Sequence, residues 1–179
     1  QAVFNLVYDN STMKPTYSAS SVFVPPAAAT DVCLLNGSAT KTVKVRRIIL
    51  SGVSNVVQSD PVAVIKRSTA NSGGPTGALV EVPYDSTNSL TPAVAQTATA
   101  VALNYTAVGT VGTAVGTLAD PHMQWGNLTT GLGSQLTITF GQLGSPVVLR
   151  GVAQGLAVNL NTQTFLTPVL SCTFEWTEE

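Results

Sequence analysis

Charged side chains are scarce in this sequence: Asp, Glu, Lys and Arg make up only 9% of its 179 residues. Ordinary soluble proteins carry roughly 25%. With a formal net charge of −1, the chain lacks the clustered basic excess by which proteins bind nucleic acid. Its apolar fraction of 44% is too high for a disordered acidic chain. The composition therefore favours a folded structural or binding protein, and we expect no nucleic-acid partner.

Catalysis needs titratable side chains within reach of one another, and this chain has few of them. His122 is the single histidine, and as a general base it would need an orienting carboxylate and a nucleophile. Asp120 is near, but Pro121 makes the segment turn-like, which favours an exposed or hydrogen-bonded histidine. No two carboxylates stand out as a glycosidase pair, and no phosphate-binding loop is present. We expect no enzymatic activity and no cofactor.

Cysteine is also scarce, and the two residues present, Cys33 and Cys172, lack the spacing and the nearby histidine of a zinc site. Alternation places Cys172 on the same strand face as Phe174 and Trp176, which favours a buried thiol; a disulfide with Cys33 remains open. No apolar run approaches the roughly 20 residues of a membrane span. Neither a metal nor a membrane is expected. The start at Gln1 shows no basic signal-peptide region and indicates that an initiator methionine or a longer leader preceded it.

Alternation of apolar and polar residues, rich in β-branched side chains and broken by turn residues, is abundant. It predicts about nine or ten strands without the helices that a parallel α/β sheet needs. Asn36-Gly37, after a strand expected at residues 31–35, is a hairpin signal. Three glycines within residues 109–117 argue against a central strand there. The expected fold is all-β: an antiparallel β-sandwich of the jelly-roll type over residues 31–179.

Residues 1–30 are predicted to form an extended N-terminal arm. Pro25-Pro26 forbids regular ladder pairing, and the rest is rich in Ser, Thr and Ala with isolated apolar residues. A segment of this composition suits ordering on a partner. The proposed arm anchors are Phe4, Leu6, Tyr8 and Phe23.

Two further sets of residues are candidates for binding. The first is basic, and its members are either solvated or ion-paired strand residues, or an interface to an acidic partner: Lys41, Lys44, Arg46, Arg47, Lys66, Arg67 and Arg150. The second is aromatic, and its members are either core and rim residues or a sugar-binding platform: Tyr105, Trp125 and Trp176.

Three stretches carry a resemblance to a known group of proteins. They are VIKRSTANSGG (64–74), NYTAVGT (104–110) with VGTL (115–118), and VLRGVAQGLAVNL (148–160). Together they resemble small virion structural proteins of tailed bacteriophages, over residues 43–160. The resemblance implies a head decoration (cement) protein, or another minor head or tail component. It implies a trimer of β-sandwiches seated on the capsid surface, with the major capsid protein or other virion subunits as partners, and it transfers no functional residues.

The predicted function is therefore that of a non-enzymatic virion protein, a capsid decoration protein that binds the outer shell as an oligomer and stabilises it. An arm and broad strand faces add contact area without a pocket. Deleting residues 1–30 is expected to abolish particle binding and leave the sandwich folded. The alternative is a secreted carbohydrate-binding or adhesive sandwich, for which we expect a Cys33–Cys172 disulfide and an exposed aromatic platform.

Overall fold

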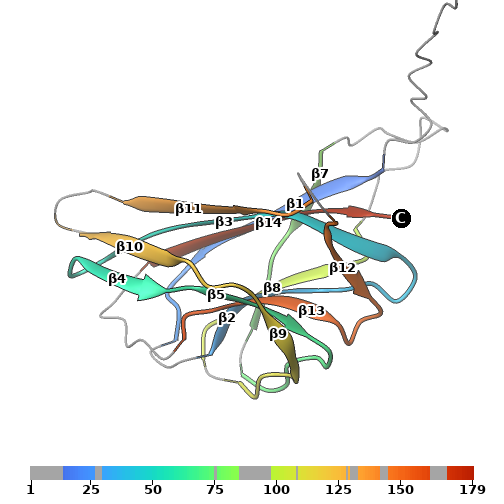
Figure 1. Cartoon of the computed structure of the whole chain (residues 1–179), viewed down its shortest axis with the longest axis horizontal. Helices are drawn as coiled ribbons and strands as arrows, with labels where there is room; N and C mark the ends of the chain where they lie inside the picture. The colour runs from blue at the N-terminus through green and yellow to red at the C-terminus, as the bar shows by residue number, and fades with distance from the viewer. Residues whose placement is uncertain are drawn as a thin grey trace, which may run out of the picture.

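The computed structural model describes residues 14–26, 30–74, 76–84, 98–107, 109–127, 129, 133–141, 145–161 and 169–179. All regular structure in these ranges is β-strand. Two sheets lie one over the other as two layers (Figure 1). The all-β sandwich predicted from the alternation is confirmed, and the jelly-roll subtype stays a prediction.

The larger sheet has eight strands. They are β1 (Thr16–Phe23), β3 (Thr42–Ser54), β4 (Gln58–Pro61), β7 (Glu81–Pro83), β10 (His122–Asn127), β11 (Ser134–Thr139), β12 (Val147–Arg150) and β14 (Val169–Glu178). Their order is β4-β10-β3-β14-β1-β7, and β11 and β12 both pair with β3. The pairs are antiparallel except for a short parallel pairing of β10 with β3.

The smaller sheet has six strands. They are β2 (Asp31–Asn36), β5 (Ala63–Arg67), β6 (Thr76–Ala78), β8 (Val101–Tyr105), β9 (Ala114–Ala119) and β13 (Gly155–Asn159). Their order is β6-β8-β2-β13-β5-β9. The glycine-rich segment supplies β9 at the edge of this sheet, in agreement with the expectation that it is not a central strand.

The core lies between the two sheets, where alternate residues of each strand point inward. Ile48 and Leu50 of β3 and Phe174 of β14 are fully buried in one cluster with Leu35 of β2 and Val158 of β13. Burying such a side chain contributes roughly 1.5–3 kcal/mol. The strands of the two layers are therefore held together mainly by these apolar contacts.

The predicted hairpin at Asn36-Gly37 is wrong. β2 and β3 belong to different sheets, so this dipeptide carries the chain from one layer to the other. The Gly37 amide donates to the Gln154 carbonyl at 2.8 Å. A Cβ at Gly37 would lie 2.6 Å from the Gly151 carbonyl oxygen, so the crossing needs a glycine for close approach. Turn chemistry alone does not distinguish a hairpin from such a crossing.

The sheet begins earlier than the predicted boundary at residue 30. β1 pairs with β14 over its whole length, Thr16 to Phe23, and with β7 on its other side. Phe23, proposed as an arm anchor, is 9% exposed and belongs to the core cluster. The other proposed anchors, Phe4, Leu6 and Tyr8, lie outside the described residues. β1 ends before Pro25, as expected from the missing amide of proline.

Candidate interaction surface

The outward side chains of the larger sheet form a surface of hydroxyl and apolar groups. β1, β14 and β3 lie side by side, and their register forms cross-strand rows of Val22, Ser171 and Ser51, and of Ser20, Thr173 and Ile49. The Ser20 and Thr173 hydroxyls are hydrogen-bonded at 2.7 Å. These rows contain no charged side chain, so a partner that covers them desolvates no ion.

The next row of this face is charged. Arg47 donates from Nε to Glu175 Oε2 at 2.9 Å and from Nη2 to Glu175 Oε1 at 2.6 Å. Burial raises the pKa of Glu175, but hydrogen bonds from Arg47 and Tyr84 outweigh it, so the pKa lies below its usual value. Hydrogen bonds from its neighbours therefore favour the ionised carboxylate, which keeps some contact with water.

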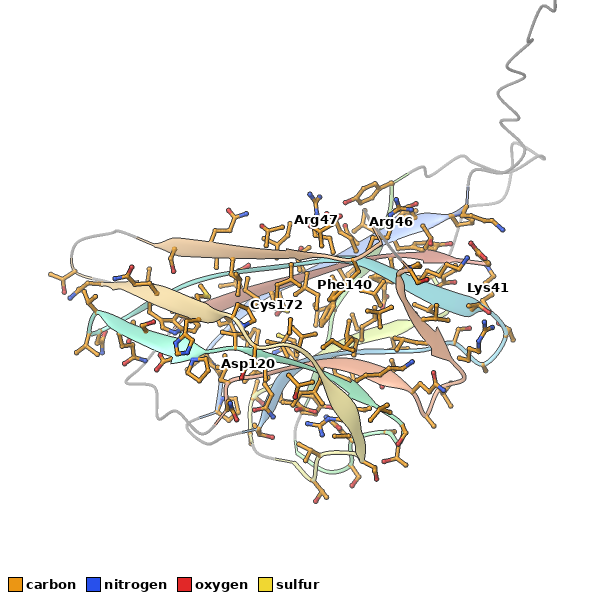
Figure 2. All side chains as sticks on the ribbon, in the orientation of Figure 1. Lys41, Arg46, Arg47, Asp120, Phe140 and Cys172 are labelled. Atoms are coloured by element: carbon orange, nitrogen blue, oxygen red, sulfur yellow. The ribbon has the colours of Figure 1, made fainter. Side chains whose placement is uncertain are left out.

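Arg46 stands beside this pair at an irregularity in the sheet. Glu175 is opposite Arg47 and Trp176 is opposite Val45, so Arg46 has no residue opposite it on β14. Such bulges re-aim side chains, and Figure 2 shows Arg46 and Arg47 on the outer side of the layer. A depression of about 230 Å³ adjoins them, lined by Arg46, Arg47, Thr139, Phe140, Gly141 and Glu175.

Most of the basic candidate residues are engaged within the chain. Lys44 pairs with Glu179 at 2.7 Å, Lys41 with Glu178 at 3.8 Å, Arg47 with Glu175 and Arg67 with Asp31. The residues of this set that form no ion pair with a described residue are Arg46, Lys66 and Arg150. Lys66 and Arg67 lie on β5 of the smaller sheet, so the structure does not bring the seven basic residues together as one patch.

The carboxylate of Glu178 has a structural role inside the fold. It is buried and accepts hydrogen bonds from the Thr99 amide at 2.9 Å and the Ala100 amide at 2.9 Å. The Trp176 indole also donates to it at 3.1 Å. These contacts join the end of β14 to the start of β8, so this carboxylate links the two sheets.

The centre of the outer face of the smaller sheet is covered by the chain itself, while its edge strand β9 is exposed. Leu34, Tyr105 and Ala157 form a second buried cluster there, and burial raises the pKa of Tyr105. Loops 68–74 and 106–113 meet in a bridge between Ser72 and Thr110. The second sheet therefore has apolar contacts on both faces.

A buried ionic cluster fixes this cover. Arg67 donates to Asp31 from Nη2 at 2.6 Å and from Nε at 3.0 Å, and from Nη1 to the Gly112 carbonyl at 3.0 Å. Asn71 and Asn159 donate to the same carboxylate at 2.9 and 2.8 Å. Asp31 thus accepts four hydrogen bonds, and sequence reasoning did not single it out. The stretches quoted for the resemblance supply Arg67, Asn71 and Asn159 to it.

The remaining candidates are placed apart. His122 is exposed at the start of β10, opposite Pro61 of β4. Tyr105, Trp125 and Trp176 are 3%, 0% and 0% exposed, so these aromatic residues present no sugar platform. Trp176 stacks on Tyr17 inside the core with ring centroids 5.8 Å apart.

Cys33 of β2 and Cys172 of β14 are buried free thiols. Burial raises the pKa of Cys33 well above its usual value, and a hydrogen bond with Cys172 adds to this shift. The expectation that Cys172 is a buried thiol is confirmed. The two thiols therefore lie in contact with each other between the two sheets.

Within the described ranges, no three His, Cys, Asp or Glu side chains are grouped so as to hold a metal ion. The same part of the chain contains no helix with the length and apolar character to cross a membrane. Comparison with protein-family models, with curated proteins and with solved structures finds no match to this chain.

Proposed function

We propose that the chain is a non-enzymatic structural protein of a tailed-phage particle, a decoration protein that binds the outer shell of the head as a trimer and stabilises it. The observation that supports this most is the contrast between the sheets. Loops cover the centre of the outer face of the smaller sheet, around Leu34, Tyr105 and Ala157, although its edge strand β9 leaves Val115 and Leu118 exposed. The larger sheet is open across its central strands, where the uncharged rows include the exposed Val22. An open sheet face suits a broad protein partner better than a small molecule.

The carbohydrate-binding alternative has less support. The aromatic residues proposed for it, Tyr105, Trp125 and Trp176, are buried. Mass spectrometry with and without reductant tests its remaining expectation, the Cys33–Cys172 disulfide, because the bridged chain is two hydrogens lighter.

The proposal is tested by adding the purified chain to particles that lack it. We expect the protein to sediment with the particles and to raise the temperature at which they release their genome. A minor head or tail protein would be found in virions without covering the shell, and absence from virions would contradict the proposal.

Whether the N-terminal arm contributes to particle binding is better tested by a deletion shorter than residues 1–30. Deleting all of residues 1–30 would remove β1, and with it Tyr17 and Phe23 of the core. Deleting residues 1–13 removes Phe4, Leu6 and Tyr8 and leaves β1 in place. We expect this variant to keep the thermal unfolding of the full chain and to lose particle binding; a variant that still decorates particles would show that the arm is not the anchor.

A further inference from the structure

Strand β7 turns its apolar side toward solvent. In residues 79–84, Val80, Val82 and Tyr84 occupy alternate positions, and they are 78%, 54% and 59% exposed. The intervening Glu81 points inward, where its Oε1 accepts a hydrogen bond from the Ala102 amide of β8 at 3.4 Å. A strand normally turns its apolar set to the core, and contiguous exposed apolar side chains mark interaction sites.

This apolar strip is continuous with the charged row of the same sheet. Val82 is opposite Ser18, Ser18 is opposite Glu175, and Glu175 is opposite Arg47. Tyr84 also hydrogen-bonds with Glu175 and Arg47. An apolar centre bordered by tyrosine and arginine is the composition of protein interfaces and of their energetic hot spots.

The charges beside the strip indicate what would cover it. Glu175 is engaged by Arg47, while Arg46 forms no ion pair with a described residue, so this corner has an excess of positive charge. A second copy placed on the strip by a two-fold axis would bring two Arg46 side chains toward each other. A neighbouring copy in the proposed trimer has few described carboxylates to offer, because Asp31, Glu175, Glu178 and Glu179 are ion-paired within their own chain. A different surface that offers carboxylates fits better, because complementary charge is favoured across an interface.

We propose that Val80, Val82 and Tyr84, with Arg46 at their border, form the surface by which the protein docks on a shell subunit that presents an apolar patch flanked by carboxylates. This inference rests on the proposed function and adds to it the docking face and the chemistry of the partner. Val22, 71% exposed on the outward side of β1, extends the surface along the sheet.

The first measurement asks whether the strip is free in the isolated protein. Val82→Cys is labelled with a maleimide, and Val152→Cys, at a turn residue that is 59% exposed, is the control. We expect both thiols to react at similar rates in the free protein and the Val82→Cys thiol alone to become protected on particles. Slow labelling of a monomeric Val82→Cys protein would mean that its own chain covers the strip, and would overturn the proposal.

The second measurement is co-sedimentation with particles that lack the chain. Val82→Lys and Arg46→Glu are compared with Val152→Lys and Lys66→Glu, which make the same chemical changes at positions outside the proposed surface. Each test variant should bind at least about tenfold more weakly, the loss expected for a hot-spot residue. Both controls should bind like the unchanged protein, and all four variants should melt like it.

The outcomes separate the two proposals. If the unchanged protein binds and the four variants bind equally well, the docking face is wrong and the proposed function stands. If the unchanged protein does not bind particles, both fail. If sedimentation velocity shows that Val82→Lys dissociates an oligomer of the free protein, the strip is covered by a second copy, and the proposed partner is wrong.

Discussion

The outer faces of the two sheets each carry a bidentate arginine–carboxylate ion pair, and the two pairs differ in how far they are buried. In both, the shortest contact is 2.6 Å. The Arg67 and Asp31 side chains are 6% and 1% exposed, enclosed by loops that add Asn71 and the Gly112 carbonyl. The Arg47 and Glu175 side chains are 42% and 12% exposed on an open face.

The difference shows that contact geometry does not set the energetic value of an ion pair. An exposed pair gains little because water screens it. Breaking a buried pair strongly lowers the stability of the fold, since removing one partner leaves the other charge without solvent or counter-ion. The covered face therefore behaves as part of the core, and the open face keeps its charges at the surface, where a partner can use them.

The largest expected effect comes from removing the arginine of each pair. Arg67→Met leaves Asp31 buried beside two amides, and we expect it to lower the free energy of unfolding by about 3–5 kcal/mol. Arg47→Met should leave the urea midpoint nearly unchanged, because Glu175 remains in contact with water. Urea unfolding of both variants measures this, and equal losses would remove the distinction between the two faces.

A smaller effect is expected from the loops that cover the smaller sheet. A Cβ at Gly112 would overlap the Thr69 carbonyl oxygen, whereas a Cβ at Gly116 of β9 meets nothing within 4 Å. Gly112→Ala should destabilise the protein by about 1–3 kcal/mol through overpacking, and Gly116→Ala should stay within roughly 0.5 kcal/mol. Thermal unfolding compares the two. A Gly112→Ala protein as stable as its control would mean that the loop packing over this face adjusts freely.

Local patterns in the sequence account for much of the sandwich. Val43 and Val45 alternate with polar residues and are buried, and the glycines of residues 109–117 argue against a central strand, where the structure has the edge strand β9. β1 has a weaker sequence pattern, because its inward Ala19 and its outward Ser18 and Ser20 are all small residues. Small residues give a weak alternation signal, and only the pairing with β14 shows that this segment is a central strand.

The binding surface and the ionic cluster depend on long-range placement. Alternation puts Val80, Val82 and Tyr84 on one side of β7, but it does not say which side faces the core. Asp31 and Arg67 are 36 residues apart in the sequence. β13 pairs with both of their strands, but Asp31 is opposite Asn159 and Arg67 is opposite Gly155, so the long arginine side chain has to span this offset along the sheet. A sequence pattern records the period of a strand, whereas partners across a sheet are set by topology.

The smallest expected effect is a shift in the titration of the open pair. Hydrogen bonds from Arg47 and Tyr84 hold the pKa of Glu175 below its usual value, against the effect of burial. The stabilisation from this carboxylate is therefore present above the pKa of an unfolded glutamate and is lost as the pH falls through the lower folded pKa. Arg47→Gln should raise the pKa of Glu175, followed by NMR of the carboxyl carbon. Arg150→Gln, at an exposed arginine that forms no ion pair with any described residue, should leave this pKa unchanged. A Glu175 pKa that stays low in Arg47→Gln would mean that Tyr84 and the charge of Arg46 suffice to hold it, and the open face would then resemble the covered one in having a carboxylate fixed by several donors.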